Sequence, residues 1–260
     1  MKCMIYQVYL GAENNLYNFC TDSVKKYCAK HGIDHIVQKE PILKIQPDIK
    51  NMGRSMQSFQ RLGYLPIYEK ENAFSYLDQY DAIAIVDSDI FIRDNAPNIF
   101  EELTDYTFAG VVEREMPITH KYAFKIKSYS HGQYGSLKDV NWKWNDRGAE
   151  FMNMGLMMFS SNLKQYLKGN SPKEFIMRPE FKGFVDGIGN WKWSTDQTLL
   201  NYWIKKENMK VKNLSWKWNA LYSAVETNKL NEAHFIHFFL KDLLPEKGEN
   251  IKSLVSELGI

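Results

Sequence analysis

Two aspartates, one residue apart, follow a short apolar run in the first half of the chain. The run from Ala82 to Val86 carries no charge, and Asp87 and Asp89 come directly after it. Such a run of small and β-branched residues is typical of a strand buried on both faces, as in parallel sheets. Because residues i and i+2 of a strand point to the same side, both carboxylates can reach one cation. Two oxygen ligands of this kind favour Mn²⁺ or Mg²⁺ over Zn²⁺.

The same Asp-Ser-Asp pattern also has a simpler interpretation. Pairs of this kind arise by chance, and a carboxylate at the end of a strand often caps the helix that follows. A short motif is a hypothesis until its context supports it. Metal binding by Asp87 and Asp89 therefore depends on what the rest of the chain supplies.

The composition restricts the class of protein. A chain of 260 residues with a net charge of +2 can form a sizeable core and gives no argument for nucleic-acid binding. The three cysteines, Cys3, Cys20 and Cys28, are an odd number without zinc-site spacing, which fits a reducing compartment. No signal peptide and no run of about 18 apolar residues is present. We expect a cytoplasmic protein without a transmembrane segment, and contact with a membrane surface through aromatic or basic residues stays open.

Strand and helix patterns alternate along the chain. This alternation predicts a single α/β domain with a Rossmann-like, mostly parallel central sheet and helices on both faces. Residues 116–148 show no clear period and are long for a loop, so they are a candidate lid or substrate loop. Strands are predicted at 3–10, 34–38, 82–86, 107–113, 151–160, 211–214 and 235–239, and helices at 15–31, 55–62, 67–77, 97–103, 171–177, 196–208 and 250–258.

A Trp-Lys-Trp sequence occurs three times, at 142–144, 191–193 and 216–218. In an extended segment the two rings of one copy face the same way. Such rings can stack on sugar faces, or they can pack in the core as most tryptophans do. We take Trp142, Trp144, Trp191 and Trp193 as candidate acceptor-binding residues, with core packing as the alternative for each ring.

Four short blocks occur in a fixed order between residues 80 and 240. They are Tyr80-Asp-Ala-Ile-Ala-Ile-Val-Asp-Ser-Asp-Ile-Phe-Ile92, Phe151-Met-Asn-Met-Gly-Leu-Met-Met-Phe159, Thr195-Asp-Gln-Thr-Leu-Leu-Asn201 with 214–219 after it, and Phe235-Ile-His-Phe238. Together they resemble the GT-A glycosyltransferases, most closely the family 8 group of glycogenin and the bacterial lipopolysaccharide galactosyltransferases. The resemblance implies a GT-A fold and a metal-dependent enzyme. It also implies transfer of a hexose from a UDP-sugar to a glycan or lipid-linked acceptor, with retention of configuration.

The resemblance also implies roles for individual residues. His237 would join Asp87 and Asp89 as the third ligand to Mn²⁺ or Mg²⁺, and Asp196 and Gln197 would lie beside the anomeric carbon as catalytic residues. Residues 1–115 would bind the nucleotide sugar, and residues 116–260 would bind the acceptor. The residues expected to contact the donor are Tyr9, Lys70, Asp87, Ser88, Asp89, Asn153, Gly155 and Lys241, with Arg61 or Arg54 as alternatives to Lys70.

Three other functions remain open from the sequence. An inverting GT-A enzyme would use the same aspartates but needs a carboxylate base, for which Asp186 or Asp196 are candidates. A phosphoryl-transfer hydrolase would want a hydroxyl residue where Phe91 stands. A binding module that has lost catalysis would keep the fold. Anomeric NMR of the product separates the retaining enzyme from the inverting one.

Overall fold

A six-stranded sheet forms the centre of the molecule. The structure is a computed structural model that describes residues 1–48 and 54–259, and within them the strand order of this sheet is β2-β1-β3-β6-β5-β7. Every residue of β3 is buried, as its uncharged sequence predicts. The strands are β1 (Cys3–Val8), β2 (Asp34–Gln38), β3 (Ala82–Val86), β5 (Phe108–Val112), β6 (Met152–Ser160) and β7 (Val211–Asn213).

The mixed α/β architecture is confirmed, but the sheet is partly antiparallel. β1 pairs in parallel with β2 and β3, and β5 pairs in parallel with β7. β6 lies between β3 and β5 and runs antiparallel to both. The residues of β6 are almost all buried and apolar. This pattern is typical of parallel strands, but it arises from burial on both faces, which β6 has although it runs antiparallel.

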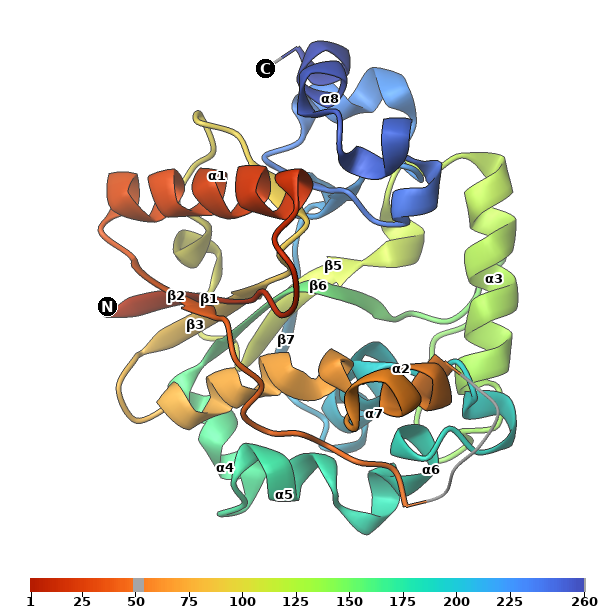
Figure 1. Cartoon of the computed structure of the whole chain (residues 1–260). Helices are drawn as coiled ribbons and strands as arrows, with labels where there is room; N and C mark the ends of the chain where they lie inside the picture. The colour runs from red at the N-terminus through yellow and green to blue at the C-terminus, as the bar shows by residue number, and fades with distance from the viewer. Residues whose placement is uncertain (49–53, 260) are drawn as a thin grey trace.

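Helices cover both faces of the sheet, as the sequence predicts. Figure 1 shows α1 (Asn15–His31) above the sheet and α2 (Arg54–Leu62) and α7 (Asp196–Lys206) below it. The side chain of Asn14 caps α1 by accepting a hydrogen bond from the third residue along, and Gly32 ends it in the left-handed region with φ 64°. Local capping signals therefore set both ends of this helix.

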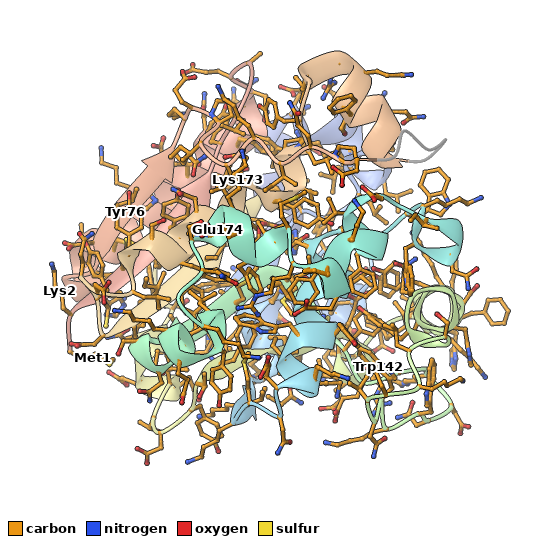
Figure 2. The ribbon with its side chains drawn as sticks, turned by 90° about the horizontal axis from the view of Figure 1, so that it is seen from below. Met1, Lys2, Tyr76, Trp142, Lys173 and Glu174 are labelled. Carbon is orange, nitrogen blue, oxygen red and sulfur yellow. The ribbon has the colours of Figure 1, made fainter. Side chains whose placement is uncertain are left out.

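The predicted helix at 67–77 is a 3-10 helix, η1 (Pro66–Tyr76). Residues 68–74 are all buried, so this segment has no single apolar face of the kind that marks an α-helix. Figure 2, viewed from below, shows α5 (Pro172–Ile176), where Lys173 and Glu174 are labelled, in front of η1. The other α-helices in the described ranges are α3 (His120–Tyr134), α4 (Lys164–Leu167), α6 (Lys182–Val185) and α8 (Ile251–Leu258).

The prediction of an irregular loop at 116–148 is wrong for its first half, which forms α3. Thr119 caps the helix by accepting a hydrogen bond from the backbone N–H of Tyr122. The buried side of α3 includes Ser130 and Gln133 beside apolar residues. These polar residues weaken the apolar period that would have marked a helix. None of the helices in the described ranges combines the length and the apolar character that a membrane crossing requires.

A second, three-stranded sheet brings distant parts of the chain together. Its strand order is β4-β9-β8, from β4 (Ile90–Ile92), β9 (Phe235–His237) and β8 (Ala220–Leu221). Ile90 pairs with His237, and the backbone N–H of Phe238 donates to the carbonyl oxygen of Asp89 at 2.9 Å. This sheet therefore places the residue after Asp89 opposite His237, 147 positions further along the chain.

Candidate active site

The predicted metal aspartates and the predicted histidine meet at one point. Asp87, Asp89 and His237 each offer one ligand atom, and these atoms lie within 4.8 Å of one another. The Nε2 atom of His237 lies 3.2 Å from Oδ1 of Asp89 and 4.0 Å from Oδ2 of Asp87. Two carboxylates and one imidazole suit a divalent cation that accepts both oxygen and nitrogen ligands. The donor set therefore fits a divalent metal such as the one that the sequence predicts.

Asn219 determines which nitrogen of His237 faces the aspartates. The Nδ1 atom of His237 lies 3.1 Å from the side-chain oxygen of Asn219, which assigns the ring proton to Nδ1. Nε2 then keeps its lone pair for a metal, and such outer partners orient metal-binding histidines in many proteins. Burial lowers the pKa of His237, but the carboxylate of Asp89 outweighs this effect and the net pKa is raised.

Lys70 is a buried cation that joins Asp87 to Asp196, the first residue of α7. Its Nζ atom lies 3.0 Å from Oδ1 of Asp87 and 2.9 Å from Oδ2 of Asp196. It also donates to the carbonyl oxygen of Met154 at 2.8 Å. Burial by itself lowers the pKa of Lys70, but the charges of Asp196 and Asp87 outweigh it and raise the pKa. Lys70 therefore stays charged, and its contact with a donor stays a prediction.

An irregularity in β6 supplies two backbone contacts of the site. The register between β5 and β6 shifts between Gly110 and Val111, so the β6 residues around Met154 leave that ladder. The backbone N–H of Met154 donates to Oε1 of Gln197 at 3.2 Å, and its carbonyl oxygen accepts the bond from Lys70. One residue of β6 thus holds both Lys70 and the predicted catalytic Gln197.

Asn153 belongs to a buried network along the pocket. Its side-chain oxygen accepts from Asn219 at 2.9 Å and from the backbone N–H of Gly155 at 3.0 Å. Its amide nitrogen donates to Glu113 at 2.9 Å, and the second oxygen of Glu113 accepts from the hydroxyl of Tyr122 at 2.6 Å. Burial raises the pKa of Glu113. A buried network with its partners in place fixes these side chains.

These groups line one pocket with a volume of about 400 Å³. The two predicted catalytic residues, Asp196 and Gln197, lie on its wall at the start of α7, whose N-cap is Thr195. Ser88 is half-buried in the turn between the two aspartates. The lining also includes Lys70, Asp87, Asp89, Glu113, Tyr122, Lys125, Tyr129, Asn153, Gly155, Trp193 and His237.

Tyr9 and Lys241 lie beside this pocket and are not among its lining residues. The ring of Tyr9 is 2% exposed, with the Nζ atom of Lys39 3.7 Å from its centroid. Tyr17 packs edge-on against Tyr9, and the Nζ atom of Lys241 lies 3.7 Å from the centroid of Tyr17. Burial and the charges of Asp89 and Asp87 raise the pKa of Tyr17, so this aromatic pair lies near the metal aspartates. Their contacts with a nucleotide stay predictions.

The four tryptophans predicted to bind the acceptor have different environments. Trp142 is 2% exposed and stacks on Tyr134 at 4.2 Å, so it has no free ring face and packs in the core instead. Trp191 is half-buried, packs on Phe184 and donates to a backbone oxygen of α3. Trp144 is 42% exposed outside the pocket lining, whereas Trp193 is 49% exposed and lines the pocket. Trp193 is therefore the ring best placed for an acceptor.

Arg61 and Asp186, alternatives to Lys70 and Asp196, are not among the residues that line the pocket. Arg61 is exposed on α2 and does not line the pocket, and the side chain of Arg54 lies outside the described residues. Asp186 is buried, accepts a hydrogen bond from the backbone N–H of Asp48 at 2.7 Å and does not line the pocket.

Sequence reasoning assigned no role to Glu113 or Asn219. Glu113 directly follows the apolar run of β5, as Asp87 follows that of β3. An acid after a buried strand is the same signal in both places and could have identified Glu113. Asn219 ends the 214–219 part of the third sequence block, but that pattern gives it no partner, and only its place before β8 brings it to His237.

Comparison with solved structures relates this arrangement to known proteins. No protein-family model and no curated protein sequence matches this chain. Its structure aligns with a glycosyltransferase involved in the glycosylation of the major capsid of PBCV-1, with a TM-score of 0.54 and 13% identity over 97% of this chain and 100% of that one. An active-site mutant of LgtC aligns with a TM-score of 0.51 and 12% identity over 99% of this chain and 96% of that one.

The chain has the fold of these glycosyltransferases. The resemblance to GT-A glycosyltransferases that the four sequence blocks indicate is confirmed at the level of the fold. The identities are too low to transfer a substrate or a residue role. In this glycosyltransferase fold, the geometry of the pocket itself indicates the roles of its residues.

Gly155 is required by the close approach of His237 in this glycosyltransferase fold. A Cβ atom at position 155 would lie 2.2 Å from Cε1 and 2.6 Å from Nδ1 of His237. We expect Gly155→Ala to displace the ring and break its bond to Asn219. Affinity for Mn²⁺, measured by isothermal titration calorimetry, should fall about 10- to 100-fold, as when other outer partners of a metal histidine are lost.

Gly110→Ala is the matched control, because a Cβ there meets the end of a flexible side chain, Sδ of Met152 at 2.9 Å. It lies in the neighbouring strand and should keep metal affinity near that of the unmodified protein. Unchanged Mn²⁺ affinity in Gly155→Ala would contradict the placement of His237 at the metal.

Glu71 is a buried acid on η1 without a compensating bond. It is 1% exposed, and neither carboxylate oxygen has a hydrogen-bond partner among the described residues. Burial raises the pKa of Glu71 well above its usual value, and the charge of Asp196 adds to the rise. A carboxyl with a raised pKa takes up a proton on folding, so its contribution to stability falls as the pH rises above its unfolded pKa of about 4.3.

We expect Glu71→Gln to remove this loss, because glutamine imitates the protonated acid. The difference in unfolding free energy between Glu71→Gln and the unmodified protein should grow by up to about 1.4 kcal/mol per pH unit. This difference starts to grow above the pKa of Glu71 in the unfolded chain, and it stops growing at the pKa of Glu71 in the folded protein. Denaturant unfolding at several pH values measures it, with Glu101→Gln at an exposed position as the control. Parallel pH profiles for Glu71→Gln and the unmodified protein would refute the assignment.

Proposed function

We propose that this chain is a metal-dependent glycosyltransferase. It would move a hexose from a UDP-sugar to a glycan or lipid-linked acceptor with retention of configuration, in a cytoplasmic setting. One observation carries the proposal: the Asp87, Asp89 and His237 group and the Asp196 and Gln197 pair line the same pocket of a glycosyltransferase fold. The two halves of the chain, 1–115 and 116–260, both contribute to this pocket.

Each group of residues in the pocket has its own role in this proposal. A divalent metal bound by Asp87, Asp89 and His237 would neutralise the charge that develops on the diphosphate as the sugar leaves. Lys70 holds Asp87 and Asp196 in place through its two ion pairs. The carboxylate of Asp196 would accept hydrogen bonds from donor hydroxyls, and Gln197 would lie next to the anomeric carbon. The bond from Met154 to Gln197 keeps that side chain in position.

The ion pairs of the pocket favour retention over inversion. An inverting enzyme needs a carboxylate free to remove the proton of the acceptor hydroxyl. Of its two candidate bases, Asp196 is already paired with Lys70, and Asp186 does not line the pocket. The anomeric configuration of the product, read by proton NMR, tests this choice. A product with the opposite configuration to the donor would replace the retaining mechanism with the inverting one.

The acceptor would enter past Trp193. This ring is half-exposed at the pocket, and Lys125 and Tyr129 of α3 also line it. A sugar face can stack on an exposed indole ring, while the amine and hydroxyl can bond to acceptor oxygens. This arrangement suits a glycan or the sugar end of a lipid-linked acceptor.

A thermal-shift screen tests the proposed function. The whole chain is melted with UDP, with several UDP-sugars and with GDP-mannose, each with Mn²⁺, with Mg²⁺ and with a chelator. We expect one UDP-sugar to raise the melting temperature only when metal is present. A ligand at 100 times its Kd adds about 2.7 kcal/mol, which is about 5–10 °C for a chain of this size. Mass spectrometry of the reaction with that donor then detects transfer or hydrolysis of the sugar.

Two outcomes would reject the proposal. One is the absence of any stabilisation by nucleotide sugars in the presence of either metal. The other is stabilisation of equal size with and without the chelator, which would show that nucleotide-sugar binding does not need a metal. Stabilisation without any turnover would favour the binding module that keeps the fold.

A further inference from the structure

The outward face of α3 combines basic residues with an exposed aromatic ring. The helix contains Lys121, Lys125 and Lys127, two histidines and no acidic residue. All three lysines are exposed. Phe124 lies among them and is 77% exposed, although a phenylalanine ring gains nothing from contact with water. This face is therefore both positively charged and apolar at its centre.

Charge is concentrated in this part of the chain. Residues 116–148 contain six lysines and arginines against two aspartates, a net charge of +4, whereas the whole chain carries +2. Of the two acids, Asp139 is already bonded to Lys206 and Tyr202. Asp146 is exposed in the segment after the helix, but α3 itself carries no acid, so Lys121 and Lys127 keep their positive charge on its outward face.

A second exposed ring lies on the same side of the helix. Positions 124 and 131 are seven residues apart, which places them on one face about two turns from each other. Trp144 stacks on His131 with ring centroids 4.6 Å apart and is itself 42% exposed. Two exposed rings thus follow one edge of α3, with Lys121 and Lys127 on either side of Phe124.

The helix that carries this face also forms part of the pocket wall. Figure 1 shows α3 as an outer helix at one edge of the molecule, beside the central sheet. Tyr122, Lys125 and Tyr129 of the same helix line the candidate active site. A surface bound by the outward face would therefore lie across one helix from the wall of the pocket.

We propose that the outward face of α3, defined by Lys121, Phe124, Lys127 and the neighbouring Trp144, binds the surface of an anionic lipid bilayer. Lysines near an anionic leaflet are attracted to its phosphates, and aromatic rings insert at the level of the headgroups. The ring of Phe124 protrudes from a convex helix, and a fluid headgroup layer can adapt to such a ring. The lipid contact does not depend on the proposed function. Its consequence for catalysis rests on the proposed function: the acceptor would be a lipid-linked sugar presented at that surface.

Vesicle flotation tests the lipid contact without any sugar nucleotide. The whole chain is mixed with vesicles of phosphatidylcholine alone, or of phosphatidylcholine and phosphatidylglycerol in equal amounts. We expect binding to the anionic vesicles only, weakening as NaCl is added. The variant Lys121→Glu with Lys127→Glu should lower the partition coefficient about tenfold or more. Phe124→Ser should also lower it, and that loss should persist at low salt because it removes apolar insertion.

A matched variant on other faces controls for charge and exposed apolar area. Lys26→Glu with Ile42→Ser changes an exposed lysine on α1 and a side chain that is 56% exposed in a loop. It should bind anionic vesicles as the unmodified chain does. All these positions are exposed, so thermal unfolding should stay within about 0.5 kcal/mol of the unmodified protein.

Three results would overturn the lipid proposal. The first is equal binding to neutral and anionic vesicles, or to neither. The second is binding that the control variant reduces as much as the α3 variants do. The third is a loss of self-association or of nucleic-acid binding in the α3 variants without a change in flotation, which would assign the face to a second copy or to a nucleic acid. Failure of sugar transfer alone would reject the proposed function and leave the flotation result standing.

Discussion

Replacing Asp89 with asparagine should lower kcat for sugar transfer by about 10²- to 10³-fold, the size of effect seen when one group that stabilises developing charge is removed. Asp89 lies 3.2 Å from His237 and within the group that can hold a divalent metal. Asparagine keeps the shape of the side chain but removes its negative charge, so the site should bind Mn²⁺ more weakly. Initial rates at several Mn²⁺ concentrations measure the effect, and excess metal should restore part of the activity.

The fold should not suffer from this change. Asp89 is half-buried. Burial raises the pKa of Asp87 and the charge of Asp89 adds to the rise, so removing that charge relieves repulsion when no metal is bound. We expect the metal-free variant to be as stable as the unmodified protein or slightly more stable. Asp94→Asn, five positions further along and exposed, is the matched control and should keep full activity. Full metal-dependent turnover in Asp89→Asn would refute the metal site.

Replacing Lys70 with methionine should destabilise the protein by about 3–5 kcal/mol, the usual cost of leaving a buried charge without its partner. The Nζ atom of Lys70 contacts Asp87, Asp196 and the carbonyl oxygen of Met154, all within 3.0 Å. Asp196 is 3% exposed, so the change would leave this buried side chain without its ion-pair partner. Donor turnover should also fall strongly, because two carboxylates of the pocket lose the group that positions them. Denaturant unfolding and initial rates measure the two effects.

A double-mutant cycle separates the ion pair from simple loss of volume. Lys70→Met combined with Asp196→Asn removes both charges, so we expect the double variant to recover part of the stability lost in Lys70→Met. Its activity should remain low, because Asp196 itself is missing. Strict additivity of the two unfolding free energies would show that the two residues are not coupled and would contradict the observed pair.

Local sequence patterns were sufficient for most elements of the fold. The helix at 15–31 and the strands at 34–38 and 82–86 match the structure residue for residue. Their signals are local: a capping residue, an apolar period and a glycine that ends the helix. The Asp-Ser-Asp pair was recognisable for the same reason, because a charge-free strand precedes it directly. The 3-10 form of η1 and the helix α3 were missed, because buried polar residues in both segments obscure the apolar period.

The site required contacts that no local pattern encodes. The pairing of Ile90 with His237 makes the metal group, and the shifted register of β6 frees Met154 to hold Lys70 and Gln197. Burial also decided between the two interpretations of the tryptophans, since Trp142 packs in the core while Trp193 lines the pocket.

The sequence by itself determined which residue types this protein offers for chemistry: two carboxylates separated by one residue after a buried strand, a late histidine and an Asp-Gln pair at a helix start. It could do so because these signals depend on neighbours in the chain. Only the tertiary structure decided that they meet in one pocket, that Lys70 and Asn219 hold them there, and that Glu113 binds Asn153 beside them. Those relations depend on strand register, strand direction and burial, which are set by packing between residues that are distant in the sequence.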